Sequence, residues 1–178
     1  MRSFLAAIFL LAAAVPLAAQ GTQNASMTAS IRVLSPISFV TGQNLDFGTH
    51  FTPTSGTSVV TCQGVGAVGR WDGFAAPGQV IDVSISRPAS LQRVGNTATL
   101  AFVVGSDAAL LRPDGGPSVH FNPAGLSGYT LPTGGSGGFS IELCSTPASA
   151  DQDIQVSIPS GAASGTYQGT LVATVVQH

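Results

Sequence analysis

Short segments in which apolar and polar residues alternate recur along the chain, and this period of two limits what the sequence can fold into. The clearest is the last: from Tyr167 the odd positions carry Tyr, Gly, Leu, Ala and Val, and the even positions carry Gln, Thr, Val, Thr and Val. Other such segments are residues 25–33, 79–86, 139–144 and 154–158. Gly, Pro and Asn turns separate them, and no helical period follows the first twenty or so residues. We therefore predict an all-β chain that forms an antiparallel sandwich of about eight or nine short strands.

The last alternating segment also carries a turn signature. Tyr167 enters it two residues after Gly165, and residues 159–161 read Pro-Ser-Gly. This arrangement resembles the tyrosine corner of immunoglobulin-like sandwiches, in which the tyrosine hydroxyl bonds back to the preceding loop. In a complete sandwich of that kind another strand follows, whereas this chain ends at His178. We therefore expect a sheet edge that the domain itself leaves unfilled.

Residues 1–19 have the pattern of a secretory signal peptide: Arg2 is followed by an apolar run and then by small residues up to Ala19. The apolar run is too short to span a bilayer, which takes roughly 20 residues. An uncleaved anchor is the alternative. We expect cleavage after Ala19 and export of the mature chain.

The mature chain opens on an alternating stretch, with Ala25, Met27 and Ala29 on one side. Two interpretations stay open: one long first strand, or a free apolar arm over residues 20–30 that precedes a domain over residues 31–178. The arm is the sharper hypothesis, because it would be a candidate donor strand for another molecule.

The chain has two cysteines, Cys62 and Cys144. In an exported protein such a pair usually forms a disulfide. A metal site is a weaker interpretation, because no pair of histidines lies near them, and a redox site is weaker because they lack C-x-x-C spacing. We expect a disulfide that stabilises the fold by about 4 kcal/mol through chain entropy.

Charged residues make up only 8% of the chain, against roughly 25% in an average domain. There is no lysine, and after removal of Arg2 five arginines face eight acidic residues. Nucleic-acid binders cluster lysine and arginine, so the composition argues against nucleic acid and equally against an anionic membrane surface. Beyond the signal peptide, no stretch is apolar for long enough to span a membrane.

No catalytic or metal-ligating constellation stands out. The histidines are isolated, Glu142 is the sole glutamate, and no serine lies in a G-x-S-x-G elbow. Asp151 and Asp153 could share a calcium ion with Asp107 or Asp114, but solvated turn residues are the better interpretation. We predict no enzyme activity, no cofactor and no metal, although a Ser-His-Asp triad assembled only by folding would leave no mark in the sequence.

The remaining segments carry weaker signals. We expect a turn at residues 41–44, a short strand at residues 45–48 with a bulge at its glycine, and a loop over residues 107–117, which are rich in Asp, Gly and Pro. We interpret Trp71 and Phe74 as core or core-rim packing, with a binding platform as the alternative.

Motifs near both ends of the domain resemble a family of exported bacterial pilin-like domains. Residues 45–49 read LDFGT, residues 158–161 read IPSG and residues 165–170 read GTYQGT. The family includes spore coat protein U, the archaic chaperone–usher pilins and an uncharacterised group with the same LDFG and G-x-Y-x-G-T marks. The sequence departs from the coat-protein-U type in having no cysteine in residues 31–40 and in ending on Gln-His, residues 177–178, in place of a terminal aromatic residue.

The resemblance implies a pilin-like, immunoglobulin-like sandwich that lacks its last strand and is completed by the N-terminal arm of the next subunit, which is donor-strand complementation. The implied donor residues are Ala25, Met27 and Ala29. The implied residues of the acceptor groove or core are Leu45, Phe47, Tyr167, Leu171 and Val175. Implied partners are further copies of the chain, joined head to tail, and a periplasmic chaperone with an outer-membrane usher. The implied location is the periplasm in transit, then the cell surface or the medium.

The sequence thus predicts a structural subunit of a bacterial surface fibre, pilus or coat. The alternative is a self-complete secreted sandwich that acts as a non-enzymatic adhesin or ligand-binding module, with Trp71, Phe74 and residues 107–117 as its contact face. The two hypotheses differ in residues 20–30, which are free in the first and folded back beside the last strand in the second.

Overall fold

The computed structural model describes residues 36–178, except residues 65 and 146. In chain order the strands are β1 (Ser38–Gln43), β2 (Thr57–Val60), β3 (Gly69–Phe74), β4 (Val80–Ser86), β5 (Ser90–Arg93), β6 (Thr99–Val104), β7 (Ala109–Pro113), β8 (Val119–Phe121), β9 (Leu126–Thr130), β10 (Gly138–Leu143), β11 (Ile154–Pro159), β12 (Tyr167–Gln168) and β13 (Val172–Gln177). Two 3-10 turns, η1 (Cys62–Gly64) and η2 (Ala150–Gln152), lie between strands. None of the helices in the described residues has the length and apolar character to span a membrane.

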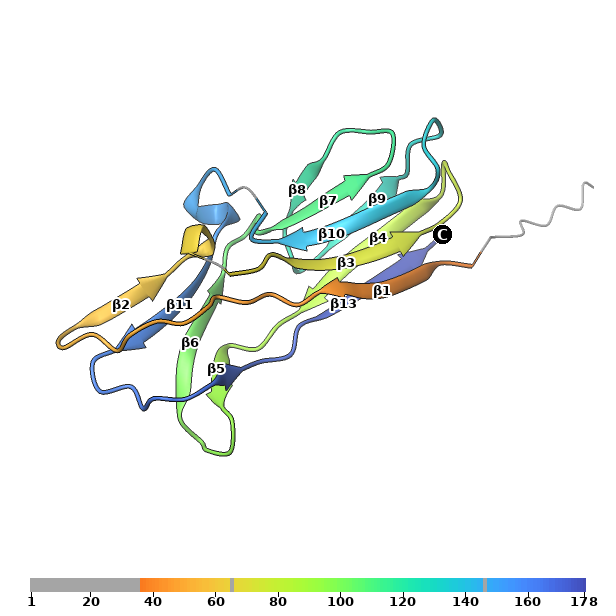
Figure 1. Cartoon of the computed structure of the whole chain (residues 1–178). Coiled ribbons are helices and arrows are strands. Elements are labelled where there is room, and N and C mark those ends of the chain that lie inside the picture. The colour runs from red at the N-terminus through yellow and green to blue at the C-terminus, as the bar shows by residue number, and fades with distance from the viewer. Residues whose placement is uncertain (1–35, 65, 146) are drawn as a thin grey trace, which may run out of the picture. The chain divides into compact units, whose positions relative to one another are not determined.

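The first layer is an antiparallel sheet with the strand order β1-β3-β10-β7-β8. Figure 1 shows β3, β10 and β7 side by side at its centre. The alternation in β10 predicted that one face of the strand is buried, and its residues Phe139, Ile141 and Leu143 are all buried in the core.

The second layer consists of two antiparallel sheets, β13-β4-β9 and β12-β5-β6-β11-β2. The chain passes from β4 to β5 and from β12 to β13 within a few residues, so the same two stretches of chain build both sheets. The inward side chains of β4, Ile81, Val83 and Ile85, are 0%, 1% and 5% exposed. They face the first layer and form one core with it.

The strand order is that of an immunoglobulin-like sandwich. Strands β1, β3, β10 and β7 reproduce the A-B-E-D order of one immunoglobulin sheet, and β4 beside β13 reproduces the C–F pair of the other. The all-β antiparallel sandwich predicted from the alternation is therefore confirmed. In an immunoglobulin sandwich strand G lies on the other side of F. Within the described residues no strand pairs with that edge of β13.

Three local predictions are wrong. Residues 107–117 are not a loop: they contain β7, in which Ala109, Leu110 and Leu111 are buried. A strand covered on both faces has a continuous apolar run instead of an alternating one, so its signal was lost among the flanking Asp, Gly and Pro residues. Residues 41–44 are not a turn, because β1 continues to Gln43 through a register shift after Thr41.

Residues 45–48 form no strand but a single bridge between Asp46 and Ala67. Of the two aromatic residues predicted to pack in the core or at its rim, only one does so. Trp71 is half-buried and packs against the core, whereas Phe74 is 50% exposed.

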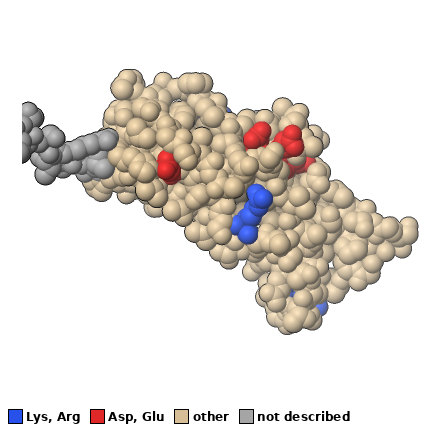
Figure 2. All heavy atoms as spheres, turned by 180° about the vertical axis from the view of Figure 1, so that it is seen from behind, with Lys and Arg blue, Asp and Glu red and all other residues tan. Residues whose placement is uncertain are grey.

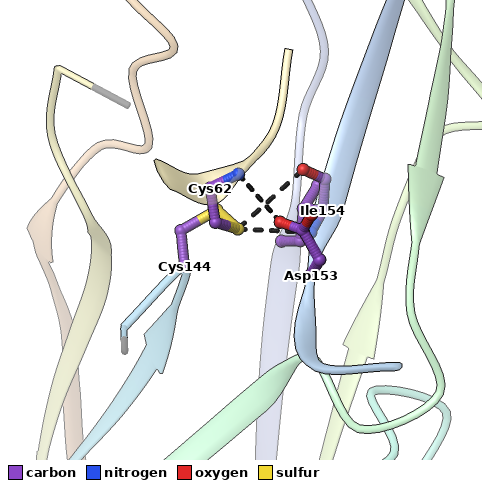
Figure 3. Close-up of a disulfide and its surroundings, with 4 residues drawn as sticks. All are labelled: Cys62, Cys144, Asp153 and Ile154. Carbon is purple, nitrogen blue, oxygen red and sulfur yellow. Dashed lines mark hydrogen bonds between the residues drawn. A yellow bond between two sulfur atoms is a disulfide. The ribbon is translucent and has the colours of Figure 1, made fainter. Parts of the chain in front are cut away.

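The predicted disulfide is present between Cys62 and Cys144, which lie 82 residues apart in the sequence and have Cα atoms 4.9 Å apart. Cys62 follows β2 in the second layer and Cys144 follows β10 in the first, so the bond ties the two layers together. Figure 3 shows how Asp153 supports it: Asp153 Oδ1 accepts hydrogen bonds from the N–H groups of Cys62 at 2.8 Å and Ile154 at 2.9 Å. Asp153 therefore serves a structural purpose at this junction.

The predicted tyrosine corner is also present, because the Tyr167 hydroxyl donates to the Ala163 carbonyl at 2.8 Å. We expect Tyr167→Phe to lower the free energy of unfolding by about 1 kcal/mol, the usual net worth of one such hydrogen bond. Urea denaturation followed by fluorescence measures it. Tyr129→Phe is the matched control, since the Tyr129 hydroxyl makes no hydrogen bond with the described residues, and an equal loss in both variants would contradict the prediction.

Candidate functional site

A groove of about 1090 Å³ lies beside β12 and the residues that lead into β13. Its walls are two stretches far apart in the sequence, residues 43–52 and residues 162–171. Its floor is formed by inward side chains of the second layer, among them Leu91, Leu100 and Phe102. The groove is therefore a tertiary feature that opens along one side of the sandwich.

One wall exists because the chain leaves the first layer after β1. Gly48 has a φ of 79°, which favours glycine, and its N–H donates to Asp46 Oδ1 at 2.8 Å. This turn aims Leu45 and Phe47 at the core, where the Phe47 ring meets the edge of Phe102 with centroids 6.3 Å apart. The LDFG motif thus lines the groove with apolar side chains.

The inward face of β13 remains incompletely covered. Leu171, Ala173, Val175 and Gln177 face the core side but are only half-buried, in contrast to the fully buried inward residues of β4. Apolar side chains normally become buried when a neighbouring strand covers them, and the hydrophobic gain is about 25 cal/mol per Å². The lining of the groove includes Leu171, the residue immediately before β13, so the half-buried face and free edge of β13 continue from the end of the groove.

The edge of β13 is also unusually open to pairing. Its six residues pair with β4 without any register shift, and they include neither proline nor a charge. Natural sheets protect their edges with short strands, charges, bulges or proline. Other edges here follow that rule: β8 has three residues and β12 has two, and β1 and β9 carry register shifts.

The groove carries very little charge. Asp46 is the sole formally charged side chain among the described residues that line it. Figure 2 shows the same character on the face seen from behind, where a few separate acidic and basic groups stand in a largely uncharged surface. Such a groove suits an uncharged apolar segment and gives an anionic ligand no counter-ion.

The charges of the first layer are paired on its outer face. Arg112 donates to Glu142 at 2.7 Å and to Ser145 at 2.9 Å, and Arg70 contacts Asp72 at 2.6 Å. Burial by itself would raise the pKa of Glu142, but hydrogen bonds from Ser145 and Arg112 outweigh it and lower that pKa. Arg70, Asp72, Arg112 and Asp114 line a shallow hollow of about 340 Å³. Both arginines there are paired with carboxylates, and the Asp114 carboxylate accepts the Ser136 N–H at 2.7 Å.

The Asp82 side chain on β4 contacts the segments on both sides of that strand, β9 and the residue that follows β13. Its carboxylate accepts the Gly128 N–H at 2.7 Å, and His178 Nε2 lies 2.9 Å from its other oxygen. The Gly128 hydrogen bond, and after it the His178 interaction, lower the pKa of Asp82. A carboxylate whose pKa is lowered by folding stabilises the fold above its unfolded pKa, about 3.9, and that stabilisation is lost as the pH falls through the folded pKa.

We therefore expect Asp82→Asn to lower the urea midpoint at pH 7, and we expect the difference from the parent chain to vanish as the pH falls below about 4. Urea titrations between pH 2 and pH 7 measure it. His178→Gln keeps the Gly128 hydrogen bond and should have the smaller effect. A difference that does not change with pH would contradict this assignment.

The structure brings together some of the residues named from sequence. Leu45, Phe47, Tyr167 and Leu171 line the groove, and Val175 lies further along the same face of β13. The donor residues Ala25, Met27 and Ala29 lie outside the described residues. Sequence reasoning missed the floor of the groove, because Leu91, Leu100 and Phe102 read as ordinary core residues and nothing local marks them as lining a groove.

The candidate chemical residues do not come together. In the described part of the chain, no three side chains among His, Cys, Asp and Glu gather where they could hold a metal ion. His50 lies in the wall of the groove and His178 at the end of β13, and Asp153 is taken up at the disulfide.

No protein-family model matches the chain, and no curated protein matches it. Among solved structures it is similar to a chain from a chaperone–tip adhesin complex described as vital for synergistic activation of CFA/I fimbriae biogenesis. The two share 10% sequence identity with a TM-score of 0.45. The match covers 80% of this chain and 41% of that chain, so this chain spans less than half of the solved one.

Proposed function

We propose that this protein is a structural subunit of an exported bacterial fibre, pilus or coat, and that it assembles by donor-strand complementation. The acceptor is the free edge of β13 together with the groove that leads into it, and the donor is the arm of another copy, residues 20–30, with Ala25, Met27 and Ala29 turned inward. Assembly is head to tail, so the contacts do not close and a fibre results.

The observation that carries the proposal is the free edge of β13 beside a half-buried apolar face. This is the place of strand G in an immunoglobulin sandwich. A strand added there pairs with the backbone groups of the β13 edge and covers the apolar face below them, which is the β-augmentation mode of recognition.

The chemistry of the arm supports it as the occupant. Residues 20–30 contain no charged side chain and alternate small or apolar residues with polar ones, which matches a groove with almost no charge. Residues 20–37, between the expected cleavage site and β1, can extend over roughly 60 Å at about 3.3 Å per residue, enough to reach a neighbouring subunit.

The proposal also includes export of the chain and its binding by a chaperone. A signal peptide at residues 1–19 would carry the chain into an oxidising compartment, where the disulfide forms. There a periplasmic chaperone would cover the groove until an usher adds the next subunit, since an open apolar edge invites aggregation. The subunit performs no catalysis.

The proposal is tested by two neighbouring substitutions on β13 in the mature chain, expressed in an oxidising compartment and sized by light scattering. Val175→Asp places a charge on the inward face, where an apolar arm would have to bury it, and should leave monomers. Thr174→Asp places the same charge on the outward face and should assemble like the parent chain.

The self-complete adhesin is the outcome that would replace this proposal. It would be indicated by a parent chain that is a stable monomer with residues 20–30 protected from protease. Equal assembly of the Val175→Asp and Thr174→Asp variants would also contradict the groove as the acceptor.

A further inference from the structure

Gln177 is the one inward residue of β13 that is polar. It continues the face formed by Leu171, Ala173 and Val175 at the end of the strand. Its Oε1 atom is buried and has no hydrogen-bond partner among the described residues. A buried acceptor without a partner is destabilising, and native structures contain few of them.

A second buried glutamine, in contrast, has hydrogen-bond partners. Gln79 is buried as well, but its Nε2 donates to the carbonyls of Val80 and His178. The unpaired oxygen of Gln177 is therefore specific to the inward face of β13, and it lies where an added strand would dock. Such a strand has to bring a donor to this point.

The arm contains a suitable donor in the right phase. Its inward set, Ala25, Met27 and Ala29, continues two residues earlier to Gln23. A glutamine side chain has two N–H donors. No other inward position between residues 23 and 33 is polar.

We propose, on the basis of the proposed function, that the arm of a second copy runs antiparallel to β13 and that its Gln23 carboxamide donates to Gln177 Oε1. The pair fixes the register of the docked strand. The remaining facing pairs are then Ala25 with Val175, Met27 with Ala173, and Ala29 with Leu171.

The sizes of these facing residues agree with the register. The largest inward residue of the arm, Met27, meets the smallest inward residue of β13, Ala173, and the two alanines meet the larger Val175 and Leu171. Alternation of large and small residues across facing positions is what lets two strands interdigitate. A parallel arm that keeps Met27 beside Ala173 would instead put Ile31 against the unpaired oxygen.

The direction of the docked strand also distinguishes the arm of a second copy from the chain's own arm. Figure 1 shows β1 starting and β13 ending at the same end of the sandwich, so the two strands run in opposite directions. An arm that folded back into its own groove would form a hairpin with β1 and would run parallel to β13. The antiparallel register therefore belongs to the arm of another molecule.

Cysteine pairs in the mature full-length chain test the register. Facing residues of an antiparallel pair have Cα atoms about 4.5–5.5 Å apart, within the range of a disulfide. Ala25→Cys with Val175→Cys should give a ladder of covalent oligomers on a non-reducing gel. Ala29→Cys with Val175→Cys should give none, because four residues along a strand separate the two by about 13 Å.

Each other outcome overturns the register. A ladder from the second pair alone would indicate a parallel arm, and a cross-link within a monomer would indicate a fold-back. Oligomers of the parent chain without a ladder from either pair would refute the register and leave the proposed function standing. Absence of oligomers from every chain, the parent included, would remove the proposed function and the register together.

The glutamine pair has its own test in a double-mutant cycle. Gln23→Leu leaves Gln177 Oε1 without its donor and should weaken assembly about tenfold, measured as the concentration at which oligomers dissociate. Adding Gln177→Leu should bring assembly back to within about twofold of the parent. Asn24→Leu, at the adjacent outward position, is the matched control. Equal losses from Gln23→Leu and Asn24→Leu, or no recovery in the double variant, would overturn the pair.

Discussion

Deletion of residues 20–30 from the mature chain is expected to abolish assembly. The shortened chain keeps the groove beside β13 and loses the segment that fills it in the next molecule. Size-exclusion chromatography with light scattering should show monomers where the parent chain forms oligomers. No native contact of the described sandwich is removed, so circular dichroism should still report a β fold.

A synthetic peptide of residues 20–30 should bind the shortened chain. A ligand that binds only the folded state at 100 times its Kd stabilises that state by about 2.7 kcal/mol, so the peptide should raise the Tm of the shortened chain. A peptide carrying Met27→Asp should fail, whereas one carrying Thr28→Asp should act like the parent peptide, because only residue 27 has the inward phase. Unaltered assembly after the deletion would contradict the role of the arm.

Loss of the disulfide is expected to have the largest effect on stability. Its two cysteines lie 82 residues apart, and closing a loop of that size is worth about 4 kcal/mol in the chain-entropy account. For a domain of this length, each kcal/mol shifts the Tm by roughly 2–4 °C. Cys62→Ala with Cys144→Ala should therefore lower the Tm by about 8–16 °C.

The parent chain under reducing conditions is the control for that variant, because it lacks the same bond while it keeps both side chains. The two should melt at similar temperatures, and the oxidised parent should melt well above both. If the oxidised and reduced parent chains melted within about 2 °C of each other, the stabilising role of the bond would be wrong.

Several features could be predicted because each is written in a few adjacent residues. Alternation in residues 79–86 identified β4 and its inward face, since side chains of a strand point to opposite sides in turn. The Gly165–Tyr167 turn predicted the hydrogen bond of Tyr167, which spans only four residues. The disulfide followed from the number of cysteines, because two offer a single pairing.

Other features could not be predicted because they depend on which surface a segment meets. Strand β7 is buried because it lies between β10 and β8 within its sheet and packs against the core, and its apolar run is no longer than many loops contain. Phe74 and Trp71 look alike in sequence, yet they lie three residues apart on opposite faces of β3. The face of β3 on which each side chain lies decided its exposure, and the residue type did not.

The sequence by itself thus determined the fold class, the inward and outward phase of most strands, the disulfide and the apolar phase of residues 20–30. Each of these is local chemistry or a simple count. Only the tertiary structure decided that the edge of β13 lies open beside a groove and that the Gln177 oxygen is buried without a partner. Whether a strand is covered and whether a polar atom is satisfied depend on what lies across the fold, and residues far apart in the sequence meet there only after folding.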